Sequence, residues 1–331
     1  MNNVALIGCG YWGKNYVNSL RDSEKVDLKY ICDPIPSKGL PAQLLKEKGI
    51  DYYSKILDKV DSVIIATPTK MHYNIAKDCL NHGKHVLVEK PITDDVSDAE
   101  ELIKIAEKEK VVLMVGHIFK YNPAVIQLKK IIESGELGSL RYLEAKRVGL
   151  GPIRKDVSAL WDLATHDIYV SNFLIGNSPI SVSYQGVSHN KIVDDIVSLN
   201  LKYPNNILTT IYVNWEHPIK ERKFVVGGTK KAVLFDDVQP TEKLFIYNKG
   251  VDYQPISGEF GDFQAATRDG DILIPKIQSK QPLLEELNHF FNCINGSEQC
   301  RSDGRDGLEI VKILSAAEES KKRNGLEVIL R

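Results

Sequence analysis

Asp162 and His166 are the residues whose types and spacing point most directly to chemistry. They stand four positions apart within Trp161–Asp167, so on a helix they share one face. A neutral imidazole can take up a proton near neutral pH, and a neighbouring carboxylate orients the ring and stabilises its cation. The pair therefore predicts a general base. An ordinary ion pair between successive helical turns would give the same spacing.

Lys90 is a second candidate, in the tripeptide Glu89-Lys90-Pro91 that follows a predicted strand at His85–Val88. Ligands of doubly wound sheets bind at the carboxyl ends of the strands, and an ammonium there can stabilise an alkoxide that develops on a substrate hydroxyl. We expect Lys90 to do this, and the bond between Lys90 and Pro91 is a candidate for the cis form. A surface lysine at a strand end is the alternative.

Gly8, Gly10 and Gly13 form a G-x-G-x-x-G motif between a predicted strand and a predicted helix. In that context the glycines allow a tight turn, close approach of a pyrophosphate and close packing of helix and strand. Asp33 ends the second predicted strand about 20 residues later, where an acid binds the adenosine ribose and repels a 2′-phosphate. A glycine turn with a solvated aspartate is the alternative. The motif predicts NAD as cofactor, held by Gly8, Gly10, Tyr11, Trp12, Gly13 and Asp33.

The elements that would position these groups alternate between short apolar strands and amphipathic helices over the first 120 residues, which is typical of βαβ units. Strands are predicted at Val4–Ile7, Leu28–Cys32, Ser62–Ala66, His85–Val88 and Val111–Val115. Helices are predicted at Trp12–Leu20, Leu40–Glu47, Met71–Asn81 and Ser97–Glu107. We therefore expect an α/β Rossmann domain, with a doubly wound parallel sheet, over residues 1–120.

Residues 121–331 have a different pattern, in which strands separated by Pro, Gly and Asn turns dominate. The predicted strands are Leu140–Arg147, Ile180–Val187, Ile196–Leu201, Ile207–Asn214, Lys223–Gly227, Ala232–Asp236, Lys243–Tyr247 and Glu327–Leu330. The predicted helices are Pro123–Glu133, about Trp161–Leu174, Leu283–Ile294 and Gly304–Lys322. We expect an α+β domain with a large, mostly antiparallel, open-faced sheet that binds substrate and mediates oligomerisation.

Composition excludes several classes of protein. The 331 residues carry a net charge of −1, so a nucleic-acid partner is not expected. No apolar run approaches the ~20 residues needed to span a membrane, and the N-terminal segment lacks an export leader, which predicts a cytoplasmic protein without a membrane partner. The five cysteines contain no CxxC pair and the eight histidines are scattered, so we expect reduced thiols and no metal.

These motifs together resemble the Gfo/Idh/MocA oxidoreductase family, and the resemblance covers the whole chain. It rests on the glycine motif with Asp33, on Ala66-Thr67-Pro68 followed by His72, on Gly83–Pro91, and on Asp162-xxx-His166. The resemblance implies that Lys90, Asp162 and His166 are the catalytic groups. It also implies that Ala66, Thr67, Pro68, His72, Glu89 and Lys90 line the cofactor.

More narrowly, the segments Gly116–Ala124, Gly135–Gly138 and Gly151–Val157 are similar to the subgroup that oxidises the 3-hydroxyl of UDP-N-acetyl sugars. This implies a nucleotide-sugar substrate bound by Lys90, Tyr121, Asn122, Arg147, Arg154, Asp162 and His166. The two arginines are candidates to hold a diphosphate, because guanidinium groups bind phosphate oxygens bidentately. Solvated strand and loop charges are the alternative for both. Thr165 departs from the subgroup, in which proline is more usual.

Two further functions stay open at this point. A free polyol or monosaccharide such as inositol would use the same catalytic set, and a sugar- and NAD-sensing regulator would keep the fold without turnover. The second half also alternates apolar residues, with Val197, Leu199 and Leu201 on one strand and Ile207 and Ile211 on the next. Such a face needs covering. The family resemblance implies a homodimer or homotetramer through this sheet, and cover by the two C-terminal helices is the alternative.

Overall fold

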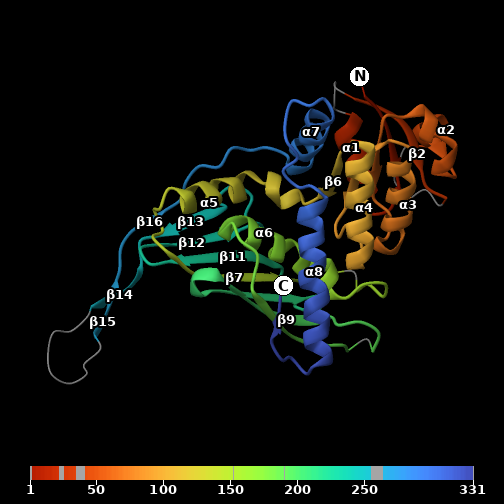
Figure 1. Cartoon of the computed structure of the whole chain (residues 1–331). Coiled ribbons are helices and arrows are strands. Elements are labelled where there is room, and N and C mark those ends of the chain that lie inside the picture. Colours follow the sequence, from red (N-terminus) through yellow and green to blue (C-terminus); the bar gives the residue numbers. More distant parts are fainter. Residues whose placement is uncertain are drawn as a thin grey trace. The chain divides into compact units, whose positions relative to one another are not determined.

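The structure is a computed structural model that describes residues 2–21, 26–34, 42–151, 153–189, 191–254 and 264–330. The chain forms two compact units (Figure 1). The first unit comprises Met1–Tyr121 and Gln281–Ser315, and the second comprises Asn122–Lys280 and Ala316–Arg331. We predicted that everything after residue 120 belongs to the second domain. The structure instead groups residues 281–315 with the first unit, because that stretch packs on the first sheet.

The first unit contains a six-stranded parallel sheet in the order β3-β2-β1-β4-β5-β6. This is the strand order of a doubly wound dinucleotide-binding fold. The strands are β1 (Asn2–Ile7), β2 (Val26–Cys32), β3 (Gly49–Ile50), β4 (Ser62–Ile65), β5 (His85–Glu89) and β6 (Leu113–Gly116). The helices are α1 (Gly13–Arg21), α2 (Ala42–Lys48), α3 (Thr69–Asn81), α4 (Val96–Glu109), α7 (Pro282–Ile294) and the first part of α8 (Gly304–Lys322). The predicted Rossmann fold is confirmed. Residues 40 and 41 of the predicted second helix lie outside the described residues.

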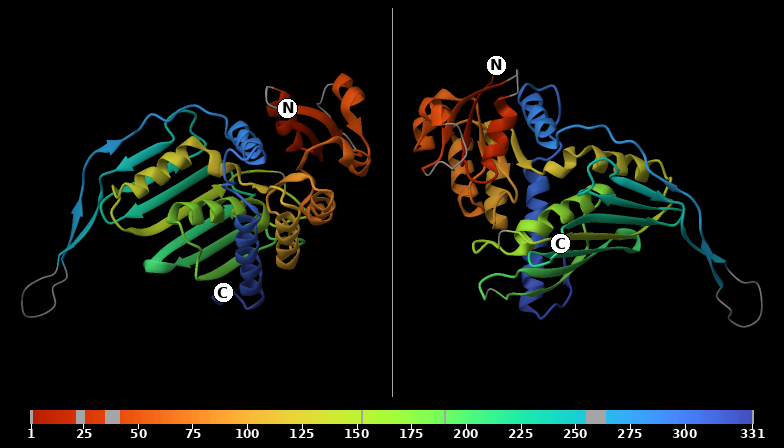
Figure 2. Two further views of the ribbon diagram at one scale, coloured as in Figure 1. Left: turned by 45° about the horizontal axis from the view of Figure 1, so that its top comes forward. Right: turned by 180° about the vertical axis from the view of Figure 1, so that it is seen from behind.

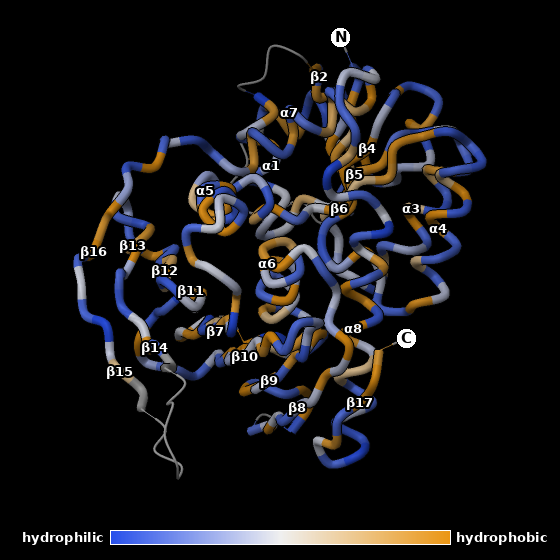
Figure 3. The backbone as a smooth tube through the Cα atoms, turned by 60° about the vertical axis from the view of Figure 1, so that its left-hand side comes forward, coloured by the Kyte–Doolittle hydropathy of each residue, from blue (hydrophilic) through white to orange (hydrophobic). Residues whose placement is uncertain are grey.

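Helices bury both faces of this sheet, which explains its nearly continuous apolar strands. One face packs Val4, Leu6 and Ile64 against residues of α1 and α7. The other face, which includes the buried Val63 and Val86, is covered by α3 and α4. In Figure 3 the tube is accordingly orange along β4 and β5. A helix formed by residues 282–294 is therefore part of the core around the first 120 residues.

The second unit contains a nine-stranded sheet in the order β16-β13-β12-β11-β7-β10-β9-β8-β17. Its strands are β7 (Leu140–Val148), β8 (Ser181–Val187), β9 (Ile196–Tyr203), β10 (Ile207–Asn214), β11 (Glu221–Gly228), β12 (Ala232–Asp236), β13 (Leu244–Tyr247), β16 (Ile272–Leu273) and β17 (Val328–Ile329). Only the pair β10 and β7 is parallel among the described strands of this sheet, so the predicted mostly antiparallel sheet is confirmed. Strands β14 (Gly250–Gln254) and β15 (Gln264–Arg268) pair separately.

One face of the nine-stranded sheet is covered within the chain by α5 (Pro123–Glu133) and α6 (Thr165–Ile175), as Figure 2 shows. The apolar residues of the second half point to this face. We expected a partner subunit or the C-terminal helices to cover them. Val197, Leu199 and Leu201 are fully buried, and the exposed fractions of Ile207 and Ile211 are only 7% and 1%. The helices that cover this face therefore come from the same chain and not from a partner subunit: α5 precedes β7, and α6 lies between β7 and β8 in the sequence. The C-terminal helix α8 also contacts the sheet, because Oγ of its buried Ser320 accepts the N–H of Tyr184 on β8 at 3.0 Å.

The opposite face of the same sheet carries the side chains that alternate with this buried set. Tyr142 on β7 is 43% exposed and Leu208 on β10 is 42% exposed. The two residues are direct neighbours in the β10–β7 register, and the ring of Tyr142 lies over Gly227 of β11. Large apolar side chains thus meet on the outer face.

Among the described residues, no helix is both long enough and apolar enough to cross a membrane.

Candidate active site

The glycine turn between β1 and α1 has the geometry that a bound dinucleotide requires. Gly8 has φ +90°, and a Cβ there would stand 2.7 Å from backbone atoms of Ala66 and Thr67. A Cβ on Gly13 would stand 2.4 Å from the carbonyl oxygen of Gly8. At Gly10, by contrast, no described atom lies within 4 Å of a Cβ position. Two glycines therefore shape the turn, and the third leaves backbone open to a pyrophosphate at the N-terminus of α1.

Asp33 lies at the end of β2, beside this turn. Its carboxylate oxygen Oδ2 accepts a hydrogen bond of 2.6 Å from the backbone N–H of Cys9. The ends of the strands are level in the sheet, since Ile7 pairs in register with both Cys32 and Ile65. The turn, Asp33 and the Ala66–Pro68 loop therefore meet at one edge of the sheet. Tyr11 is 90% exposed on the turn, and Trp12 is partly buried.

His72 has a different place from the one we predicted. Its ring is 1% exposed, with Nδ1 2.8 Å from the carbonyl oxygen of Pro91 and Nε2 2.9 Å from that of Thr67. Burial lowers the pKa of this histidine. The ring therefore connects the Ala66–Pro68 loop to the loop that carries Lys90.

Lys90 follows β5 directly, and the Lys90–Pro91 peptide bond is cis, as predicted. Glu89 accepts a hydrogen bond of 2.7 Å from the hydroxyl of Tyr16 on α1 and one of 3.1 Å from the backbone N–H of Lys90. Burial is the main reason why the pKa of Glu89 is raised. Glu89 thus fastens the lysine loop to the helix that begins at the glycine turn. Tyr16, which we did not single out from the sequence, is its partner.

Two further buried groups interact electrostatically with Glu89 or Lys90 and were not among the predicted site residues. Glu286 of α7 is fully buried, and neither carboxylate oxygen has a hydrogen-bond partner among the described residues. Burial and, to a smaller extent, the charge of Glu89 raise the pKa of Glu286 well above its usual value. His117, just after β6, is 1% exposed. Burial is the main cause, and the charges of Lys120 and Lys90 are smaller causes, that lower the pKa of His117 to about 3.

Asp162 and His166 lie where a π-helix (Leu160–Ala164) passes into α6. Single turns of π-helix inside α-helices are frequent at functional sites. Both side chains are partly exposed, and the guanidinium of Arg154 lies 3.4 Å from Oδ1 of Asp162. Arg154 also bonds Asp156 at 2.6 and 3.1 Å. Asp162, the carboxylate of the predicted pair, therefore stands beside an arginine. Pro152, in the same predicted motif, lies outside the described residues.

Arg147 does not have the role that the resemblance implied. Its guanidinium makes two hydrogen bonds, of 2.9 and 2.7 Å, to the carboxylate of Asp167. The two side chains are 9% and 4% exposed. The ion pair joins β7 to the first turn of α6, next to His166. Because Nε and Nη2 of Arg147 both bond a buried carboxylate, the structure assigns this arginine a structural contact between β7 and α6.

Tyr121 and Asn122, which we predicted to bind substrate, are also structural. Tyr121 is 1% exposed, its hydroxyl lies 3.1 Å from Ser302 Oγ, and its ring lies beside that of His289. Asn122 is 7% exposed and caps α5 by accepting the N–H of Ala124 at 2.9 Å. The Asn-Pro pair at the start of a helix is a capping signal that could have indicated this.

These features define a class of protein before any comparison is made. The first unit has a six-stranded Rossmann sheet with a dinucleotide turn at its carboxyl edge, an acid at the end of β2 and a lysine after β5. This combination is typical of nicotinamide-dependent oxidoreductases. Residues 2–117 match the family model "Oxidoreductase family, NAD-binding Rossmann fold". Residues 125–234 match the "GFO/IDH/MocA C-terminal domain". The chain belongs to the Gfo/Idh/MocA family of oxidoreductases, and the predictions of family and of NAD as cofactor are confirmed.

Relatives within the family act on different substrates. The chain is 28% identical over 258 residues to UDP-N-acetylglucosamine 3-dehydrogenase of Acidithiobacillus ferrooxidans, and the aligned region covers 77% of each protein. It is 24% identical over 348 residues to the NAD-dependent scyllo-inositol 2-dehydrogenase of Bacillus subtilis, covering 98% of this chain and 95% of that one. Among solved structures, the WlbA dehydrogenase of Bordetella pertussis in complex with NADH and UDP-GlcNAcA has the same fold (TM-score 0.78, 21% identity, 100% and 99% coverage).

Proposed function

We propose that this oxidoreductase oxidises the 3-hydroxyl of a UDP-N-acetyl sugar to the 3-keto sugar. The observation that carries the proposal is the position of Arg154, whose partly exposed guanidinium lies 3.4 Å from the carboxylate of Asp162. A guanidinium binds phosphate oxygens in a bidentate manner, so a group suited to a diphosphate stands beside Asp162, one member of the predicted catalytic pair. The similarity to UDP-N-acetylglucosamine 3-dehydrogenase supports the same substrate.

The residues divide the reaction between them as follows. The C–H and O–H bonds of the carbinol break and a C=O bond forms. The glycine turn and Asp33 would hold NAD, which would supply the hydride acceptor. His166 takes the hydroxyl proton, Asp162 orients the imidazole and stabilises its cation, and the ammonium of Lys90 stabilises the alkoxide character that develops on the oxygen. Glu89 and His72 hold the loop of Lys90 in place through the contacts described above.

The test is a panel of UDP-N-acetylglucosamine, its uronic acid, UDP-glucose, inositols and free glucose, each incubated with NAD. Turnover is followed by absorbance of the reduced nicotinamide and by mass spectrometry of the sugar. A keto-acid acceptor is included, so that turnover is detected even if the nicotinamide is recycled in place. We expect oxidation only of UDP-N-acetyl sugars, and loss of two hydrogens at C3. Oxidation of inositol with no measurable affinity for UDP would contradict the proposal.

Matched variants separate the catalytic roles from general effects. His166→Asn and Lys90→Met should lower kcat by about 10²–10⁴-fold, the usual contribution of a positioned acid–base or electrostatic group. The controls are His82→Asn and Lys70→Met, which change exposed residues of α3 and its C-terminus. Equal effects of His166→Asn and His82→Asn would remove His166 from the mechanism.

A polyol is the second candidate substrate. It is favoured by the similarity to scyllo-inositol 2-dehydrogenase, which extends over 98% of this chain. A polyol has no diphosphate, so Arg154→Met would leave its KM unchanged, whereas the same change should raise the KM for a UDP sugar. Comparison of the two KM values in this variant therefore discriminates between the candidates.

We also propose that the chain forms a homodimer or homotetramer through the outer face of the nine-stranded sheet. The support is the adjacent pair Tyr142 and Leu208, each more than 40% exposed on neighbouring strands. Large side chains in such a row are removed from water when two sheets pack face to face.

A further inference from the structure

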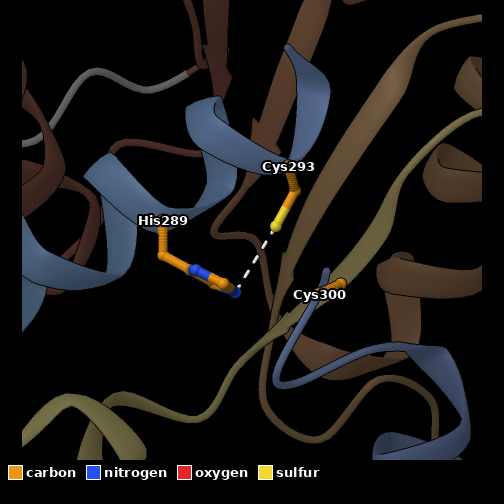
Figure 4. A group of neighbouring side chains, drawn as sticks. All are labelled: His289, Cys293 and Cys300. Atoms are coloured by element: carbon orange, nitrogen blue, oxygen red, sulfur yellow. Dashed lines mark hydrogen bonds between the residues drawn. The ribbon is translucent and has the colours of Figure 1, made fainter. Parts of the chain in front are cut away.

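His289, Cys293 and Cys300 form a cluster that neither the glycine motif nor the catalytic residues use. Nδ1 or Nε2 of the histidine and the two Sγ atoms lie within 4.8 Å of one another. His289 and Cys293 are four residues apart, so they project from one face of α7. Figure 4 shows both side chains extending from α7 toward the segment that carries Cys300. All three residues belong to the first unit.

The imidazole of His289 presents Nε2 to Sγ of Cys293, 3.4 Å away. The backbone N–H of Arg301 donates to Nε2 at 3.0 Å, and the guanidinium of Arg301 lies 3.0 and 3.3 Å from Nδ1. Nδ1 lies 2.7 Å from Oε2 of Glu298, and the amide of Asn292 donates to the other oxygen of the same carboxylate at 2.7 Å. A histidine that donates its other N–H to a held carboxylate is typical of metal ligands.

The spacing and chemistry of the donors fit zinc. Nε2 of His289 lies 3.4 Å from Sγ of Cys293. Two donors of a tetrahedral zinc ion stand about 3.6 Å apart, given Zn–S of about 2.3 Å and Zn–N of about 2.1 Å. Two sulfurs and an imidazole are a donor set that favours zinc over magnesium or calcium. His289 is 2% and Cys293 8% exposed, whereas Cys300 is partly exposed, so water can reach the remaining position.

We propose that His289, Cys293 and Cys300 bind one zinc ion, with water as the fourth ligand. This revises the expectation of no metal, which rested on the absence of CxxC pairs and overlooked the His-xxx-Cys spacing on a helix. Binding displaces the N–H of Arg301 from Nε2, so a small shift of that residue accompanies it.

The proposed zinc ion would connect two segments of the first unit, because its ligands lie on α7 and on the segment before α8. Ser302 of that segment accepts the N–H of Val115 on β6 at 2.8 Å and contacts the hydroxyl of Tyr121. The ring of Tyr121 lies 5.5 Å from that of His289. An ion at the cluster would therefore hold the segment that pairs with the end of β6.

The first test measures metal in the full-length protein, purified without a polyhistidine tag under reducing conditions. We expect about one zinc per chain by elemental analysis, and a sulfur-to-cobalt charge-transfer band when the metal is replaced by cobalt. Cys293→Ser and Cys300→Ser should each remove the band and reduce bound zinc to near zero. Cys79→Ala, which removes a buried thiol of α3 outside the cluster, should leave both unchanged.

Three results would overturn the proposal. One is wild-type protein that neither retains zinc nor gives the cobalt band. Another is an unchanged band in both serine variants. The third is a disulfide between Cys293 and Cys300 in protein isolated under reducing conditions, detected as a cross-linked peptide. If a serine variant does not fold, the wild-type cobalt spectrum decides by itself, because only thiolate ligands produce the charge-transfer band.

Discussion

Replacement of Arg147 by methionine tests the division between structural and substrate-binding arginines. The change removes a guanidinium that makes two hydrogen bonds of 2.9 and 2.7 Å to Asp167 and leaves that carboxylate buried at 4% exposure. Breaking a buried pair by removing one partner destabilises a protein by about 3–5 kcal/mol. For a domain of about 150–250 residues, each kcal/mol lowers Tm by about 2–4 °C, so Tm should fall by about 6–20 °C.

The assay is thermal unfolding together with substrate kinetics at a temperature where the variant is folded. Because the pair fixes the first turn of α6, which carries His166, kcat should fall while the affinity for UDP does not change. Arg154→Met is the matched control, since Arg154 is 37% exposed and pairs with Asp156. Its free energy of unfolding should change by less than about 1 kcal/mol, but its affinity for a nucleotide sugar should decrease.

A double variant completes the cycle. Arg147→Met with Asp167→Leu replaces both charges by apolar groups, which is often neutral or stabilising for a buried pair. Its Tm should therefore return to near the wild-type value. An Arg147→Met variant with a wild-type Tm and weakened UDP binding would refute this reasoning and restore Arg147 as a diphosphate ligand.

Three further predictions concern other parts of the molecule. Gly13→Ala should lower both Tm and NAD affinity, because its Cβ would stand 2.4 Å from the carbonyl oxygen of Gly8. Gly10→Ala should weaken NAD binding but leave Tm unchanged, since no described atom lies within 4 Å of its Cβ position. Equal losses of Tm in the two variants would contradict this. His117 has a folded pKa of about 3, below the unfolded value of about 6.5, so stability is lost as pH falls below about 6.5, by about 1.4 kcal/mol per pH unit. Denaturant titrations of His117→Gln should lack this slope, and an identical slope would exclude burial of a neutral ring as its cause. Leu208→Asp should lower the mass measured by light scattering without unfolding the chain, and an unchanged assembly would place the interface away from Leu208 and Tyr142.

Local patterns in the sequence determined the element order, the Rossmann fold and the cofactor. Helix and strand periodicities are properties of short segments, and the strands Ile207–Asn214 and Ala232–Asp236 have the predicted bounds. The glycine motif is equally local, because the strand, turn and helix that give it meaning are consecutive. Asp33 could be identified since a parallel sheet aligns the end of the second strand with the first.

Only the tertiary structure decided the partners of individual side chains. Arg147 as a strand residue is compatible with solvent, phosphate or carboxylate, and the packing of α6 on β7 selects Asp167, twenty positions away. The same applies to Tyr121, which is buried against Ser302, and to Glu286, which α7 brings to Glu89. Periodicity shows that a face is apolar but not what covers it, because covering depends on contacts between segments far apart in the chain. For the same reason the sequence left His289, Cys293 and Cys300 as scattered residues, and the folded chain brings them together.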